Sequence, residues 1–96
     1  MDFIIDALIR LYDESGGEYF TRDGYSGMRT LIIFQEQRIS CRITSENEII
    51  ERGKEHKVMI EIAFGERYEG IHVNSSFTLF DGVSVFGCGR VLDICE

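Results

Sequence analysis

The fold is decided by two adjoining stretches, Phe77-Thr78-Leu79-Phe80-Asp81-Gly82 and Gly87-Cys88-Gly89-Arg90-Val91. The first is an apolar run closed by Asp-Gly, a residue pair that is typical of a β-hairpin turn. Just before the second, the apolar phase shifts between Val85 and Phe86, close to two glycines. A phase shift beside glycine indicates a bulge or a sharp coil, as the closing strand of a barrel requires.

The rest of the chain holds further short apolar segments of strand length. Met28 to Gln35 has no alternation, which predicts burial on both faces, whereas Arg38 to Thr44 alternates like a half-buried strand. Only Glu36 and Gln37 separate the two segments, so a tight hairpin is expected. Other strands are expected at 56–64, 71–73, 77–80 and 83–94. Short strands with glycine turns and no convincing central helix predict an all-β fold, a small six-stranded antiparallel closed β-barrel.

The segment 3–12 fits two kinds of element. Phe3, Ile5, Ala7, Ile9 and Leu11 alternate like the residues of a strand. Residues 4, 8, 11 and 12 also line up at helical spacing. Periodicity alone leaves the choice between strand and helix open.

Composition and charge bound the class of protein. The chain has 96 residues, which fits one domain spanning 1–96, and its formal net charge of −7 disfavours nucleic-acid phosphates on average. The acidic opening Met1-Asp2 lacks a cationic leader, and the three cysteines have no paired spacing. The apolar runs are too short to span a membrane. These features predict a cytoplasmic protein with reduced thiols and no membrane association.

Two glycine-marked stretches resemble a known family, the C-terminal β-barrel domain of elongation factor Tu, as a stand-alone domain. The first comprises Gly16-Gly17 and then 27–34, where Gly27, Arg29 and Phe34 match the family's pattern. The second is the ungapped stretch 77–91, where Phe77, Gly82, Gly87, Gly89 and Val91 coincide with it. The resemblance runs from about residue 5 to residue 94, implies the same barrel, and favours a strand at 3–12.

The departures from the family concern its contacts with tRNA. Residues after the glycine pair, usually basic or imidazole side chains, help the family to hold tRNA, but here they are Glu18 and Tyr19. Ser84 replaces the arginine of the last motif. No phosphate-binding Walker A motif occurs, so the chain carries no GTP site of that kind. The resemblance therefore implies the scaffold more than the translation function.

The chain offers little that points to catalysis or cofactors. His56 and His72 lie sixteen positions apart, and no Cys-x-x-Cys or His-x-x-x-His pair suggests a metal site. Cys88 stands between two glycines and is expected to fill a tight position in the barrel. No base adjacent to it is evident. We therefore expect a protein that is not an enzyme and has neither cofactor nor metal.

Aromatic and charged loops are the better candidates for a binding site, because tyrosine and arginine often anchor protein interfaces. Arg29 is included because it matches a family arginine near the surface that faces the partner domains. The candidate partner-binding residues are Glu18, Tyr19, Phe20, Arg22, Tyr25, Arg29, Arg67 and Tyr68.

These residues favour a protein–protein interaction module, which mimics or blocks a translation-factor contact. One alternative is an accessory protein of translation that binds tRNA or another RNA. Another is an immunity or antitoxin-like protein against a translation-directed toxin. The oligomeric state is not readable from the sequence.

Overall fold

The computed structural model describes residues 3–12, 23–62 and 71–95, and in this part of the chain the regular structure consists of β-strands. No helix among the described residues is long and apolar enough to cross a membrane. The strands are β1 (Phe3–Leu11), β2 (Gly24–Tyr25), β3 (Met28–Phe34), β4 (Gln37–Ser45), β5 (Ile49–Ile50), β6 (Glu55–Ile62), β7 (Ser76–Phe80) and β8 (Val85–Cys95).

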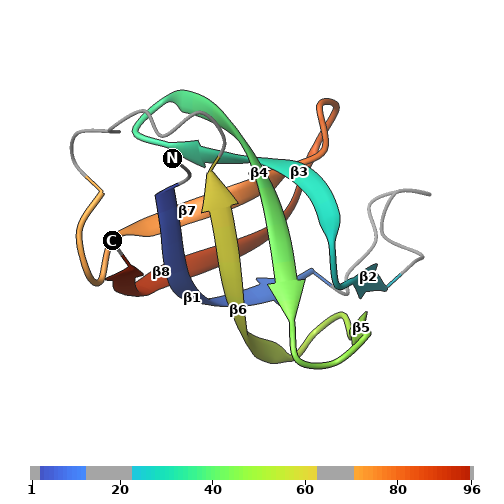
Figure 1. The fold of residues 1–96 in the computed structure, drawn as a ribbon. Helices are drawn as coiled ribbons and strands as arrows, with labels where there is room; N and C mark the ends of the chain where they lie inside the picture. The colour runs from blue at the N-terminus through green and yellow to red at the C-terminus, as the bar shows by residue number, and fades with distance from the viewer. Residues whose placement is uncertain (1–2, 13–22, 63–70, 96) are drawn as a thin grey trace.

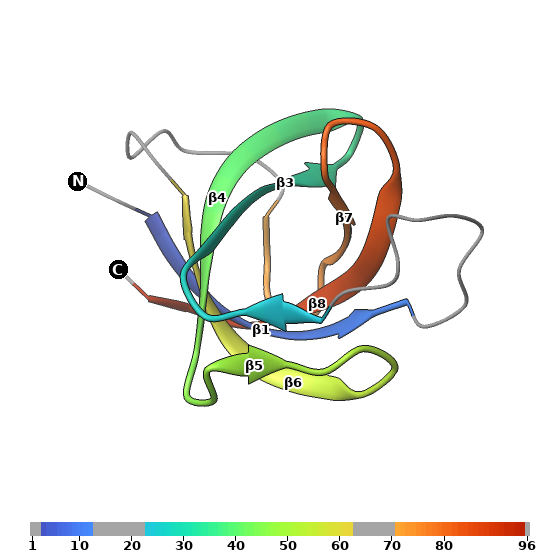
Figure 2. The ribbon, with the colours of Figure 1, turned by 90° about the vertical axis from the view of Figure 1, so that its right-hand side faces the viewer.

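Six of these strands close into an antiparallel barrel in the order β1-β6-β4-β3-β7-β8 (Figure 1). The strand β1 pairs with β6 on one side and with β8 on the other, and this double pairing closes the ring that Figure 2 shows. The remaining strands, β2 and β5, form a separate two-stranded sheet. The prediction of an all-β, six-stranded closed barrel is thereby confirmed.

The ambiguous segment 3–12 forms a strand. Ile5, Ala7, Ile9 and Leu11 are buried in the barrel, as the alternating pattern requires. The core is mainly isoleucine, whose β-branched side chain fits the pleated surface of a strand. No polar or charged residue of the described chain is fully buried. The barrel is therefore held chiefly by apolar burial and by its closed hydrogen-bond ladder.

The expectation that 28–35 is buried on both faces is wrong. In β3 only Ile32 and Phe34 are buried, while Arg29 is exposed and Leu31 lies between these extremes. The outward-facing side of β3 carries apolar residues because these are partly buried against the neighbouring strands. Leu31 pairs with Phe80, whose ring lies 4.9 Å from the guanidinium carbon of Arg38.

The hairpin predicted between these strands is present, one residue earlier than expected. Phe34 pairs with Gln37, so Gln35 and Glu36 form the turn. Their φ angles are 48° and 69°, the left-handed values that a two-residue hairpin of type I′ requires at both positions.

The hairpin after β7 also forms as the Asp-Gly pair indicates. The Asp81 carboxylate accepts hydrogen bonds of 2.7 Å from the backbone N–H groups of Val83 and Ser84. Gly82 has a φ of 99°, which favours glycine. Phe80 then pairs with Val85 and Leu79 with Gly87, which leaves Phe86 as a bulge. The predicted bulge at the phase shift is confirmed.

Residues 71–73 do not form the short strand that was expected. The Ser75 N–H donates to the carbonyl oxygen of His72, and the His72 N–H donates to the Ser75 hydroxyl. Asn74 has a left-handed φ of 72°. These local bonds offer the backbone an alternative to a sheet ladder, so the segment forms a turn before β7.

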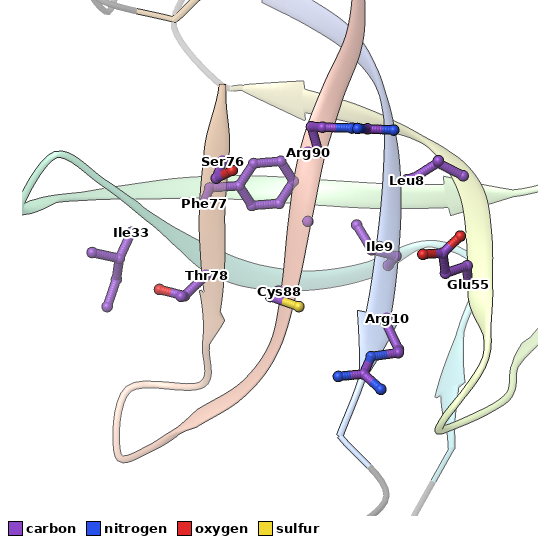
Figure 3. A pocket seen from close by; sticks show the side chains of 11 residues that line it. Leu8, Ile9, Arg10, Ile33, Glu55, Ser76, Phe77, Thr78, Cys88 and Arg90 are labelled. Atoms are coloured by element: carbon purple, nitrogen blue, oxygen red, sulfur yellow. The ribbon is translucent and has the colours of Figure 1, made fainter. Parts of the chain in front are cut away.

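In β8, Cys88 was expected to fill a tight position inside the barrel. The structure instead places Gly87 and Gly89 at the positions that have no room for a side chain. A Cβ atom at Gly89 would lie 2.4 Å from the Phe77 ring, and one at Gly87 would lie 2.8 Å from the carbonyl oxygen of Arg10. Cys88 alternates with them and lies partly exposed in an outer groove, where Figure 3 shows its sulfur. It does not fill a position in the barrel interior.

Candidate interaction surface

Two of the predicted binding residues lie in the described part of the chain. Tyr25 is in β2, with 58% of its surface exposed, and Arg29 is an exposed residue of β3. The other six lie outside the described residues: Glu18, Tyr19, Phe20, Arg22, Arg67 and Tyr68.

Tyr25 forms an exposed apolar pair with Ile49. The two residues are direct partners across the β2–β5 ladder, so their side chains lie on the same face. Ile49 is 52% exposed, whereas Ile50, one position along, is fully buried opposite Gly24. Strand alternation therefore presents Tyr25 and Ile49 to solvent together, and we call this pair the Tyr25–Ile49 patch.

Glycine at position 24 lets the ribbon lie close to the barrel. A Cβ atom there would lie 2.9 Å from the Leu11 side chain and 3.1 Å from the Met28 sulfur. The absence of a side chain lets the buried face of the ribbon reach the end of the core.

Hydrogen bonds fix both ends of this ribbon to the barrel. The Ser26 hydroxyl donates to the Ser45 carbonyl oxygen and accepts from the Ser45 N–H, each at 3.0 Å. The Arg52 guanidinium donates to the Tyr12 carbonyl oxygen at 2.8 Å, and the Arg52 N–H donates to the Asp23 carboxylate at 3.0 Å. A patch held in this way loses little further conformational freedom when a partner binds, which favours affinity.

Arginines lie beside this ribbon. Arg29 of β3 is the direct cross-strand partner of Arg42 of β4, and both are exposed. A Cβ atom at Gly27 would lie 3.7 Å from the Arg42 guanidinium, so that group lies against the turn that follows β2. No described residue forms an ion pair with either arginine. The patch is thus apolar, with an arginine pair near the turn that follows β2 and the exposed Glu48 next to Ile49 in the chain.

Sequence reasoning missed Ile49 and Arg42. Ile49 stood in a polar stretch, and the pattern gives no indication that it pairs with a residue twenty-four positions earlier. Arg42 is exposed, as the alternating pattern of 38–44 predicts, but its position opposite Arg29 depends on the hairpin register. The repeated Ile-Ile at 49–50 was the one available signal, because one of two adjacent strand residues must face outward.

Tyr12 lies next to Cys88, and His56 contacts a backbone carbonyl group. Burial, followed by the neighbouring Cys88 thiol, raises the pKa of Tyr12, so this phenol stays protonated and is a poor base for that thiol. His56 Nε2 lies 3.0 Å from the Glu51 carbonyl oxygen. Within the described ranges, no group of three or more His, Cys, Asp or Glu residues is placed to hold a metal ion.

Cys41 and Cys88 are expected to differ in reactivity. Burial raises the pKa of the Cys41 thiol to about 12, whereas Cys88 is partly exposed. In the folded protein at neutral pH, N-ethylmaleimide should therefore modify Cys88 and leave Cys41 intact, because the thiolate is the reacting species. Peptide mass mapping before and after denaturation measures this order. Equal modification of both residues in the folded protein would contradict the placement of Cys41 in the core.

No protein-family model matches the chain, and no curated protein matches it. The resemblance to the elongation factor Tu barrel therefore stays a prediction from the motifs.

Proposed function

We propose that this protein is a non-catalytic, cytoplasmic binding module that recognises a protein partner through the Tyr25–Ile49 patch and the arginines beside it. The observation that carries the proposal is the joint exposure of Tyr25 and Ile49 on a ribbon fixed to the barrel. A rigid aromatic anchor with an arginine border has the composition of interface hot spots.

The resemblance to the elongation factor Tu barrel narrows the class of partner. In that family the barrel contacts the other domains, the nucleotide exchange factor and tRNA. A lone barrel of this kind can bind a protein that normally recognises the translation factor, and so compete with that factor. Inhibition of a translation-directed toxin is one form of the same activity. We favour a protein partner over RNA because the two residues at the centre of the patch offer a mainly apolar surface.

The proposal is tested first by crosslinking. A photoreactive phenylalanine analogue is placed at position 25 or 49 in the cell of origin, with position 83 as the matched control. Val83 is 67% exposed, but it lies in the β7–β8 hairpin. A crosslinked protein that appears from positions 25 and 49 and not from 83 is then purified.

The affinity of that partner is measured by calorimetry. Tyr25→Ala should weaken binding by about tenfold or more, because loss of a hot-spot aromatic removes a large share of the binding energy. Ile49→Ala should weaken it less, and Val83→Ala should leave it unchanged. Circular dichroism checks that each variant is folded. Unchanged affinity in both Tyr25→Ala and Ile49→Ala would show that the patch is not the binding site.

A further inference from the structure

A groove of about 610 Å³ lies over strands β1, β7 and β8 (Figure 3), and none of its lining residues belongs to β2 or β5, the strands of the Tyr25–Ile49 patch. Its volume falls in the range of about 300–1,000 Å³ that is typical of small-ligand sites, and an extended segment of a few residues has a similar size. The barrel is closed, so these strands offer no free hydrogen-bonding edge. Anything that binds here is recognised by side chains.

Two exposed arginines, Arg10 and Arg90, dominate the charge of the groove. Arg10 pairs with Cys88 across the β1–β8 ladder and Leu8 pairs with Arg90, so the arginines are diagonal neighbours. Such diagonal positions lie about 7–8 Å apart. Figure 3 shows that the two side chains extend in different directions, Arg90 toward Leu8 and Arg10 away from Leu8 and Arg90. They therefore fit two separated anionic groups better than one.

No described residue forms an ion pair with either arginine. Arginines normally keep their charge in any environment, so both guanidinium groups can engage a ligand. Around them, Ser76 and Thr78 contribute hydroxyl groups, and Leu8 and Ile33 contribute partly buried apolar surface. The groove combines charge, hydrogen-bonding groups and apolar contacts.

We propose that this groove binds an extended acidic segment of a polypeptide, with two of its carboxylates on Arg10 and Arg90. In an extended chain, alternate side chains point to the same side and lie about 7 Å apart, similar to the spacing of the two strand positions from which the arginine side chains extend. This groove is a second binding site, separate from the Tyr25–Ile49 patch.

The charge pattern favours a polypeptide over a nucleic acid. Glu55 lines the same groove and is the cross-strand partner of Arg10, so the walls are not uniformly basic. A polymer with a phosphate at every repeat must place negative charge near Glu55 and near a protein of net charge −7. A polypeptide can place a neutral or basic residue there. An acidic segment can therefore pair with the arginines and place an uncharged residue nearest to the Glu55 carboxylate.

The probe for this proposal is a fluorescein-labelled synthetic peptide in which glutamate alternates with alanine. The control peptide has glutamine in place of glutamate, and single-stranded RNA of equal length is the competing ligand. Fluorescence anisotropy should show saturable binding of the glutamate peptide only. The affinity should fall as salt is raised, because exposed charges are screened within about 10 Å at 0.1 M ionic strength.

The variants Arg10→Gln and Arg90→Gln should each weaken peptide binding by about tenfold, the effect of losing one charged hydrogen bond. Arg42→Gln is the matched control, since it removes an exposed arginine on a different strand and should leave binding unchanged. Tyr25→Ala should also leave it unchanged, which separates this site from the proposed function. Circular dichroism confirms that the variants fold.

Three outcomes would overturn the proposal. The first is no saturable binding of the glutamate peptide by the wild-type protein. The second is an equal loss of binding in Arg42→Gln, which would show a general electrostatic attraction and no site. The third is tighter binding of the RNA, lost in the same two groove variants, which would assign the groove to a nucleic acid.

Discussion

Gly89→Ala is expected to destabilise the barrel by about 3 kcal/mol, at the upper end of what overpacking a core costs. The added methyl would lie 2.4 Å from the Phe77 ring and 2.9 Å from the Ile9 side chain, both of which are buried. Neither neighbour has free space, because Phe77 is 4% exposed and packs in the main core cluster. Urea unfolding followed by circular dichroism measures the loss.

A second substitution tests the cause of this effect. Phe77→Leu shortens the side chain that meets the new methyl, so the double variant Gly89→Ala/Phe77→Leu should lose less stability than the two single losses added together. Such coupling between neighbouring residues is what a double-mutant cycle detects. Simple additivity would contradict the assignment of the destabilisation to the contact between the new methyl and the Phe77 ring.

Ile60→Ala is expected to cost about 2–5 kcal/mol, the range for truncating a large aliphatic side chain in a core. Ile60 is fully buried in β6 and is the cross-strand partner of both Ile5 and Ile43. Its loss leaves a cavity where three strands meet. A domain of this size is stable by only about 5–15 kcal/mol, so the variant should unfold at a much lower urea concentration.

Met59→Ala is the matched control for this prediction. Met59 precedes Ile60 in the same strand but points outward and is 40% exposed. Its truncation should change the free energy of unfolding by less than about 1 kcal/mol. If the two variants unfolded at the same urea concentration, the assignment of the inner and outer faces of β6 would be wrong.

The sequence predicted the barrel well because most of its signals are local. Strand alternation at 38–44, the Asp81-Gly82 turn and the phase shift beside Gly87 each depend on a few neighbouring residues. Such local signals are the ones that periodicity and turn chemistry can interpret. Residues 71–73 were one exception, because two hydrogen bonds between His72 and Ser75 outweigh a weak apolar pattern.

The candidate surfaces were harder to predict because they depend on register. Tyr25 was identified from its residue type, but its partner Ile49 becomes visible only when β2 pairs with β5. Arg10 and Arg90 are eighty positions apart and meet only because β1 pairs with β8. A one-residue slip of that ladder would turn one of the two arginines to the opposite face from the other, and no short-range pattern specifies the register. Cys88 was misplaced for a similar reason, since the glycines on either side take the inner positions.

The pairing of β1 with β8 also governs how the chain reaches its native state. These strands are the first and the last among the described residues, so the ladder that closes the ring joins residues more than seventy-five positions apart. Contacts of such long range are costly in chain entropy and slow the search for the native state. During synthesis, β1 can pair with β6 long before residues 87–95 exist, and its other edge stays open until they do. The interval before closure is when this protein is most exposed to aggregation.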